Sequence, residues 1–197
     1  MRNTLAAVGA RSRFRHMRSE MKLLVALTFV IGVVTASLTA HAASGVSPAD
    51  KAALTSTLEG VVKQVESGTL ANVDPVIETL KGAVEKGKAI IAAVAAQDAS
   101  NRKVLEFIAA SVGKMYGETL ESIEHNWHKG DAIHLAGLGD IYDKIAKQSP
   151  AIVAIDAVVH PVTAILALQA YKKDQKKDHL DQVVTELKEL LDAMKAL

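Results

Sequence analysis

The segment from Pro150 to about Lys173 constrains the fold most, because its side chains are apolar in nearly every direction around a helix. Asp156 is the only charged residue between Pro150 and Tyr171. A helix with one apolar face can lie at a surface, whereas a helix that is apolar all round must be enclosed by other elements. We therefore predict that this segment forms the central and most buried helix of a folded domain.

The rest of the chain after residue 42 carries recurrent helix signals and almost no strand signals. Ser47-Pro48 and Asp74-Pro75 each place a polar residue before a proline suited to a first helical turn, and Gly130 supplies a stop. Aromatic residues are few, and no Asn-Gly or Asp-Gly hairpin turn occurs. The sequence predicts an all-α fold, an antiparallel helical bundle of five to six helices. These helices are expected approximately over residues 47–67, 74–96, 98–129, 131–148, 150–173 and 175–196.

The first 42 residues have the layout of a secretory signal peptide. An arginine-rich start precedes an uncharged run over residues 23–49, which contains Ala40-His41-Ala42. The small residues Ala40 and Ala42 fit the −3 and −1 positions of a signal peptidase site, so we expect cleavage between Ala42 and Ala43. The pattern predicts an exported protein, either periplasmic or secreted.

The leader allows alternatives in both its start and its fate. Met17 and Met21 offer later translation starts, and a start at Met21 leaves a signal peptide of ordinary length. The uncharged run also reaches the roughly 20 residues that span a bilayer, so an uncleaved anchor is the rival interpretation. Small and polar residues in its second half, such as Gly32, favour cleavage. The predicted domains are a signal peptide at 1–42 and one helical domain at 43–197, with no stable membrane anchor after cleavage.

Removal of the leader changes the charge of the chain. Residues 1–42 hold six of the 23 Lys and Arg but only one of the 22 Asp and Glu, so the net charge moves from +1 to −4. A mildly acidic domain without a basic stripe is a poor partner for nucleic acid, and we expect none. The chain has no cysteine, which excludes disulfides, thiolate metal sites and a lipoprotein anchor.

Five histidines remain after cleavage, and without cysteine they are the side chains best suited to bind a transition-metal ion or haem iron. Glu118, Glu121, His125 and His128 fall within one stripe about 80° wide on a helical wheel. The apolar residues of the same predicted helix, Trp127 among them, centre on the opposite side. We therefore expect Trp127 in the core and the stripe in solvent, where it could form an exposed metal site or a partner-contact patch.

His134 and His160 are each expected on the buried side of their own helices. Gly137 and Gly139 follow His134, and because a glycine inside a helix costs about 1 kcal/mol relative to alanine, we expect a compensating close approach of another helix or a bound group. The two histidines belong to successive predicted helices. Together they form the most specific candidate site for a metal ion or haem.

Asp156 precedes His160 by one helical turn, and two interpretations of this pair stay open. In the structural one, Asp156 and His160 satisfy each other in the core, next to a kink at Pro161. In the functional one, Asp156 orients the His160 ring from behind, so that the other ring nitrogen binds a metal ion or haem.

No motif names a reaction. The chain contains no Gly-x-Ser-x-Gly, His-Glu-x-x-His or Cys-x-x-Cys-His pattern, so enzymatic activity has no positive support, although side chains from several helices can still converge on a cleft. The favoured function is an exported binding protein that holds a metal ion or haem through His134 and His160, with Asp156 behind His160. The alternative is a non-catalytic periplasmic adaptor or chaperone-like module without a cofactor, which contacts a protein partner or a second copy of itself.

Overall fold

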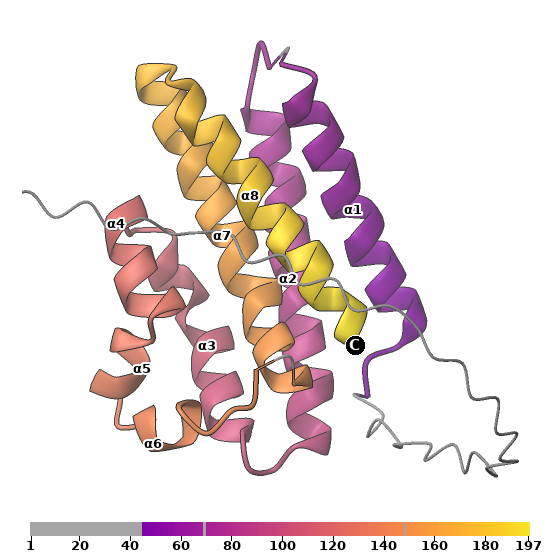
Figure 1. Cartoon of the computed structure of the whole chain (residues 1–197), viewed down its shortest axis with the longest axis vertical. Helices are drawn as coiled ribbons and strands as arrows, with labels where there is room; N and C mark the ends of the chain where they lie inside the picture. Colours follow the sequence, from indigo (N-terminus) through magenta and orange to yellow (C-terminus); the bar gives the residue numbers. More distant parts are fainter. Residues whose placement is uncertain (1–44, 69, 148) are drawn as a thin grey trace, which may run out of the picture. The chain divides into compact units, whose positions relative to one another are not determined.

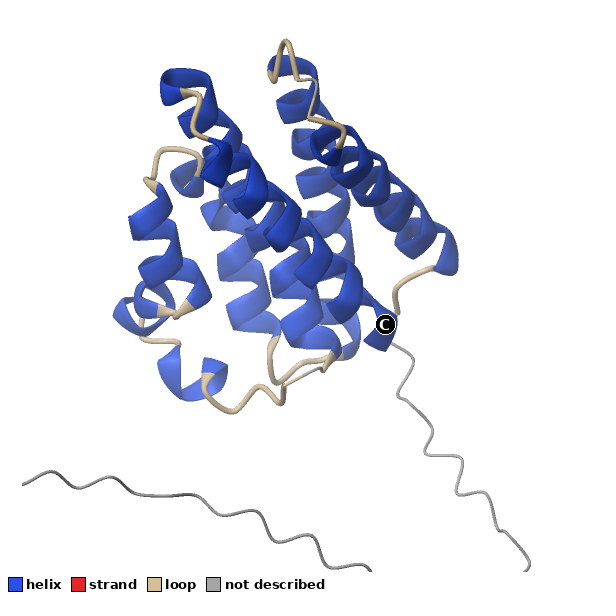
Figure 2. Ribbon diagram, turned by 45° about the horizontal axis from the view of Figure 1, so that its top comes forward, coloured by secondary structure: helices blue, strands red, loops and turns tan. Residues whose placement is uncertain are grey.

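The structure, a computed structural model, describes residues 45–68, 70–147 and 149–197. The predicted signal peptide, its cleavage site and the alternative starts lie outside these residues. The helices, drawn in Figure 1, are α1 (Pro48–Glu66), α2 (Asp74–Gln97), α3 (Arg102–Met115), α4 (Leu120–Ile123), the π-helix η1 (Glu124–His128), α5 (Asp131–Leu135), α6 (Gly139–Tyr142), α7 (Pro150–Asp174), α8 (Lys177–Ala193) and the 3₁₀ turn η2 (Met194–Ala196). Figure 2 shows helices and loops but no strand among the described residues, so the all-α class is confirmed.

The central helix is α7, as its apolar sequence predicts. From Ala151 to Leu168 every residue except Ile152 and Asp156 is buried. Its most extensive contacts are with α2 and α8, and Figure 1 shows α7 between α3 and α2, with α8 crossing in front of it. The helix α3 also packs against α7, and α1 covers α2 and α8. The apolar surface that α7 presents in all directions is thus removed from water by several partners.

Among the described residues, α7 is also the one helix long and apolar enough to cross a membrane. In its most apolar stretch, 89% of the residues are buried inside the protein. The core helix of a globular bundle has the same composition, so packing against its neighbours is a sufficient explanation for this apolar sequence.

Serine caps start α1 and α7, and a short connection joins α7 to α8. The side-chain oxygen of Ser47 accepts a hydrogen bond from the backbone N–H of Asp50 at 3.0 Å, and Ser149 caps α7 in the same way. At the other end of α7, Gln175 adopts a left-handed conformation with a φ of 59°. Only Lys176 then separates Gln175 from α8, so α8 runs back along α7 as an antiparallel neighbour.

The continuous helix predicted over 98–129 is wrong. The helix α3 ends at Met115, and α4 starts anew after Thr119. Thr119 Oγ1 accepts a hydrogen bond from the Ser122 backbone N–H at 3.1 Å, while Ser122 Oγ accepts one from the Thr119 backbone N–H at 2.9 Å. These reciprocal bonds satisfy N-terminal backbone donors, as in a capping box. Residues after 119 are therefore not in helical phase with those before 115.

The helix predicted over 131–148 is also interrupted. Gly137 has a left-handed φ of 74° and separates α5 from α6. At Gly139 an added Cβ would lie 2.4 Å from Nδ1 of His134, so the close approach that this glycine permits is that of the His134 ring. Over the residues that the structure describes, the bundle accordingly contains eight α-helices, three of them short, instead of the five to six expected.

Candidate metal centre

Three side chains that can ligate a metal ion converge beside the middle of α7. His128 comes from η1, His160 from α7 and Glu186 from α8. One ring nitrogen of each histidine and one carboxylate oxygen of Glu186 all lie within 4.8 Å of one another. Among the residues that the structure describes, no other group of three or more His, Asp or Glu side chains meets this criterion.

A carboxylate oxygen of Glu186 lies between the two imidazoles. Glu186 Oε2 is 2.8 Å from His160 Nδ1 and 3.7 Å from His128 Nε2. The exposed fractions of the His128, Glu186 and His160 side chains are 18%, 11% and 9%. Two donors bonded to one Zn²⁺ at about 2 Å each lie at most about 4 Å apart, so side-chain shifts of about 1 Å or less bring all three donors to one ion.

The π-helix η1 places His128 at this position. The backbone N–H of Lys129 donates to the carbonyl oxygen of Glu124 at 3.0 Å, a bond that spans five residues instead of four. Such a turn holds one residue more than an α-helical turn, so it changes the direction in which the following side chains point. His128, the last residue of η1, therefore faces α7.

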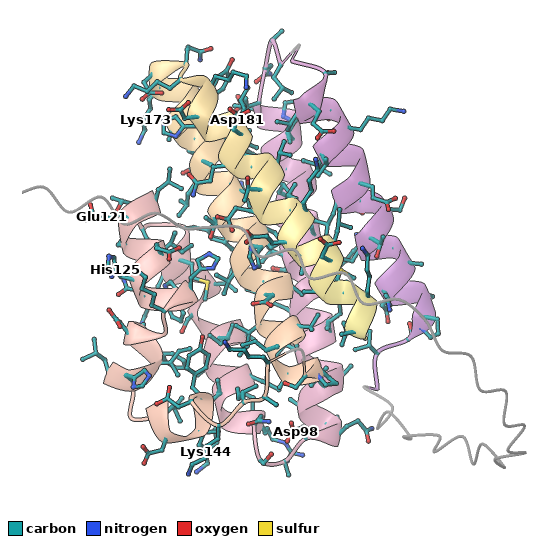
Figure 3. The ribbon with its side chains drawn as sticks, in the orientation of Figure 1. Asp98, Glu121, His125, Lys144, Lys173 and Asp181 are labelled. Carbon is teal, nitrogen blue, oxygen red and sulfur yellow. The ribbon has the colours of Figure 1, made fainter. Side chains whose placement is uncertain are left out.

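This geometry separates the four residues of the predicted solvent-facing stripe. Glu121 and His125 are exposed, and Figure 3 shows both projecting away from the neighbouring helices. Glu118 instead precedes α4 and accepts a hydrogen bond from the indole N–H of Trp127 at 2.8 Å. His128 points inward. The stripe prediction is wrong because it assumed one unbroken α-helix through this segment, whereas the burial of Trp127 is confirmed.

His160 and Glu186 are positioned by the packing of α7 on α8. Val183, Leu187 and Leu190 form the fully buried face of α8. Glu186 follows Val183 by three residues and precedes Leu190 by four, a spacing that puts its carboxylate on the same face. His160 Nδ1–H then donates a hydrogen bond to Glu186 Oε2 across the helix pair.

Thr163 fixes the tautomer of His128 in this structure. The Thr163 hydroxyl donates its only proton to the carbonyl oxygen of Val159 at 3.0 Å. Its oxygen lies 2.9 Å from His128 Nε2, so it accepts a hydrogen bond from Nε2–H. A metal ion at Nε2 must displace this proton, which leaves the imidazole neutral with its proton on Nδ1.

Burial and charge shift the pKa values of the two histidines in opposite directions. Burial lowers the pKa of His160, but the hydrogen bond to Glu186 and the negative charges of Asp156, Glu186 and Glu189 outweigh it, so the pKa lies above the ordinary 6.5. Burial is the largest effect at His128 and, together with repulsion by His160, it outweighs the attraction of Glu186, so the pKa of His128 lies below 6.5. The first proton taken up by the pair therefore goes to His160.

Asp156 lies on the other edge of the His160 ring. Its Oδ1 is 3.9 Å from His160 Nε2, which is too long for a direct hydrogen bond, and its side chain is 27% exposed. Burial raises the pKa of Asp156 above its ordinary value, against the attraction of His160. The closer partner of His160 is thus Glu186, and the expected pairing of Asp156 with His160 within α7 is present as a longer ion pair. Asp156 can still orient the ring from the edge opposite Glu186.

His134 is not part of the cluster with His160. Its side chain is 47% exposed, and its Nε2 lies 3.1 Å from Asp143 Oδ1. The expectation that His134 faces the core is wrong because α5 ends at Leu135, one residue later, so the helical wheel drawn for a long helix does not apply. His128 occupies the place that the sequence assigned to His134.

Glu186 and Thr163 are the participants that the sequence did not reveal. One local signal was present for Glu186, since it is an acidic residue at a core spacing within an otherwise apolar face of α8. Thr163 carried no signal, because a threonine inside an apolar helix normally bonds to the carbonyl four residues earlier, and Thr163 does so here.

The donor set defines which ions fit. Two imidazoles and one carboxylate suit Zn²⁺, Co²⁺, Ni²⁺, Cu²⁺ and Fe²⁺, whereas Ca²⁺ and Mg²⁺ prefer oxygen ligands alone. The His128 and His160 rings meet edge to face with centroids 5.0 Å apart, which leaves no room for a porphyrin plane between them. A haem held by this pair of histidines therefore does not fit.

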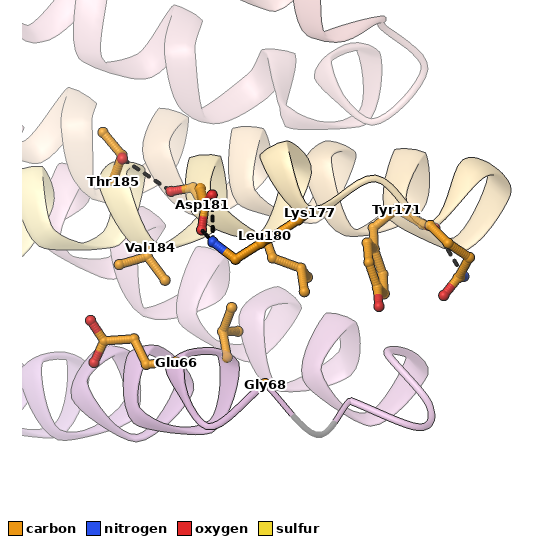
Figure 4. Close-up of a pocket in the computed structure, with 10 residues that line it drawn as sticks. Glu66, Gly68, Tyr171, Lys177, Leu180, Asp181, Val184 and Thr185 are labelled. Carbon is orange, nitrogen blue, oxygen red and sulfur yellow. Dashed lines mark hydrogen bonds and ion pairs between the residues drawn. The ribbon is translucent and has the colours of Figure 1, made fainter.

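A separate groove lies between the C-terminal end of α1 and the N-terminal end of α8, and Figure 4 shows the residues that line it. Its volume is about 700 Å³, with Val65, Leu180 and Val184 among its apolar lining residues. The charged groups at its rim pair with one another or with neighbours: Lys177 Nζ lies 2.8 Å from Asp181 Oδ1. None of the three metal-ligand candidates lines this groove.

Comparison with protein-family models, with curated proteins and with solved structures found no match to this chain. The functional argument therefore depends on the geometry of the cluster and on the chemistry of its side chains.

Proposed function

We propose that this chain is an exported helical-bundle protein that binds one divalent transition-metal ion through His128, His160 and Glu186, with Asp156 orienting His160. The observation that supports this proposal is the convergence of two imidazole nitrogens and one carboxylate oxygen within 4.8 Å, from three separate helical elements. The proposed site keeps His160 from the sequence-based hypothesis and replaces His134 with His128.

The π-helix adds independent support. A π turn is rare and less favourable than an α turn, and where it occurs it frequently lies at a functional site. Here it delivers one of the three ligands. The rival explanation is a purely structural cluster, because every buried side-chain nitrogen and oxygen among the described residues already has a hydrogen-bond partner.

Calorimetric titration of the full chain with Zn²⁺ separates these explanations. The proposal expects one high-affinity site per chain in the unsubstituted protein. His128→Ala, His160→Ala and Glu186→Gln should each weaken Zn²⁺ binding by about 10-fold or more, since each removes one of three ligands. Circular dichroism of each variant shows whether the helical fold remains.

His134→Ala is the matched control, because His134 is exposed and pairs with Asp143 outside the cluster. Its Zn²⁺ affinity should equal that of the unsubstituted chain. A larger loss of Zn²⁺ affinity in His134→Ala than in His128→Ala would favour the sequence-based hypothesis of a site formed by His134 and His160. The absence of a stoichiometric site in the folded protein would favour the structural explanation.

Export is the second part of the proposal and is supported by the residue pattern of the leader alone. N-terminal sequencing of protein recovered from its host should begin at Ala43. Material that still begins at Met1, Met17 or Met21 would contradict cleavage and would favour a membrane-anchored form.

A further inference from the structure

We infer that the metal ion at this cluster keeps one coordination position open, and that this position takes a small neutral donor, such as water or ammonia, in preference to an anion. The inference rests on the proposed metal site of His128, His160 and Glu186. It assigns to that site a class of exchangeable ligand.

The first step is the number of protein ligands. A bound Zn²⁺ or Co²⁺ takes at least four donors, and a site with three protein ligands fills the remaining position with water or another small molecule. The cluster supplies three donors from the described residues.

Two other oxygen-bearing side chains next to the cluster are poor candidates for the fourth ligand. Asp156 faces Nε2 of His160, whereas Glu186 faces Nδ1, so Asp156 lies on the ring edge away from the ion. Thr163 Oγ1 is a neutral hydroxyl whose proton is committed to the carbonyl of Val159, and it is not deprotonated as a strong ligand would be. Neither side chain closes the site.

The second step is access. His128 is the most exposed of the three ligands, at 18%, against 9% for His160. The cluster is thus largely shielded by the helices, with its remaining solvent exposure greatest at His128, which suits a donor of the size of water rather than a large substrate.

The third step is charge. A divalent ion is neutralised by the carboxylates of Glu186 and Asp156, and the carboxylate of Glu189 also acts on His160 and His128. An anion would therefore add negative charge to a partly buried site that is already balanced, and repulsion in such surroundings is weakly screened. A neutral donor adds none.

The test uses the full chain loaded with Co²⁺, whose visible absorption bands report the number and type of its ligands. Titration with ammonia should change these bands until the site is saturated. Azide should bind weakly. Asp156→Asn removes one negative charge beside the site and should strengthen azide binding by about 5- to 10-fold. The ammonia constant of the same variant is the reference, since a change in the orientation of His160 acts on both probes, whereas the lost charge acts on azide alone.

One control variant sharpens the result. Glu121→Gln removes an exposed carboxylate and should change neither constant. Co²⁺ bands that neither probe alters would overturn the inference alone. Equal azide constants in the unsubstituted chain and Asp156→Asn would overturn the preference for neutral donors. Failure of Co²⁺ to bind would overturn the proposed function and this inference with it.

Discussion

Gly87 of α2 lies directly against the backbone carbonyl of Ala157 in α7, so closely that a Cβ on residue 87 would stand 2.2 Å from that oxygen. The carbonyl is available because Pro161, four residues later, has no N–H to donate to it. The absence of a side chain on Gly87 lets α2 approach the freed carbonyl. The contact joins α2 to the central helix α7, which also carries His160.

Replacement of Gly87 by alanine should therefore destabilise the protein. The added methyl group collides with backbone, which cannot rotate away, so we expect a loss of about 1 to 3 kcal/mol in the free energy of unfolding. Gly82, in the same helix, is the matched control because nothing lies within 4 Å of its Cβ position. Gly82→Ala should raise stability by about 0.5 to 1 kcal/mol through helix propensity. Urea denaturation of both variants measures the difference, and equal effects would contradict the close packing of α2 on α7.

The long helices could be predicted from the sequence because their signals are local. Ser47-Pro48 and Ser149-Pro150 combine a cap with a first-turn proline, and the structure starts α1 and α7 at those prolines. The apolar run of α7 identified the centre of the bundle without any knowledge of its neighbours. The interruption after Met115 had a local signal, the cap of Thr119 by Ser122, that the apolar periodicity concealed. The π turn of η1 was not predictable in this way, because it places His128 against Thr163 and Glu186, contacts that form only when distant helices pack.

The candidate site was predictable only in part for the same reason. His160 stood out because it lies in the most apolar helix. Its partner Glu186 is 26 residues away, and sequence spacing does not show which residue of α8 meets a given turn of α7. His128 was noticed, but an ideal helical wheel assigned it to the wrong face. The π turn directs His128 toward α7, and the early end of α5 leaves His134 outside the site.

Asp98 should contribute to stability in a pH-dependent manner. Its carboxylate accepts hydrogen bonds from the backbone N–H groups of Ser100 and Asn101, both at 3.1 Å, and from their side chains. Slight burial raises the pKa of Asp98, but these bonds outweigh it and hold the pKa below the ordinary 3.8. The stabilisation is therefore fully present above pH 3.8 and disappears as the pH falls through the lowered value of the folded state.

Asp98→Ala should accordingly cost about 1 kcal/mol at neutral pH, the usual contribution of a side chain that caps backbone donors. The difference from the unsubstituted protein should shrink when unfolding is measured at progressively lower pH. Glu59→Ala, at an exposed position in the middle of α1, should show little change at either pH. A constant difference for Asp98→Ala across the acid range would contradict the role of its ionised form.

Trp127 offers an optical test of the proposed metal site. It is the single tryptophan of the chain, its side chain is buried, and it immediately precedes the ligand His128. A paramagnetic ion such as Cu²⁺ at His128 should quench its fluorescence with a stoichiometry of one ion per chain. His160→Ala should abolish quenching at low Cu²⁺ concentration, although position 160 lies on another helix.

His125→Ala distinguishes binding at the buried cluster from binding at the surface, because His125 is exposed on η1 and precedes Trp127 by two residues. Quenching should survive that substitution. If His125→Ala removed the quenching and His160→Ala did not, the ion would be held at the surface of η1 and the buried cluster would not be its site.

The two buried histidines should titrate in a fixed order in the metal-free protein. His160 faces Asp156 on its own helix, Glu186 and Glu189 on α8 and His128 on η1. The hydrogen bond to Glu186 and the three carboxylates raise the pKa of His160 above 6.5 despite burial. His128 has its pKa lowered below 6.5, chiefly by burial. NMR titration should thus show His160 gaining its proton at higher pH than His128, and Glu186→Gln should lower the His160 value because the accepting carboxylate is gone.

The same order fixes the sign of two contributions to stability. Because the pKa of His160 is raised by folding, its protonation stabilises the fold fully below pH 6.5, and this contribution is lost as the pH rises through the higher folded value. His128 acts in the opposite sense: its contribution is present above pH 6.5 and is lost as the pH falls through its lower folded value. His160→Gln should therefore flatten the loss of stability on the alkaline side, and His128→Gln should flatten the loss on the acid side. Chemical denaturation at a series of pH values measures the free energy of unfolding of both variants. The assignment would be contradicted if both variants changed the same side of the plot of stability against pH. Added Zn²⁺ should remove the loss on the alkaline side and steepen the loss on the acid side, since a bound ion requires both imidazoles to be neutral and protons compete with it below pH 6.5.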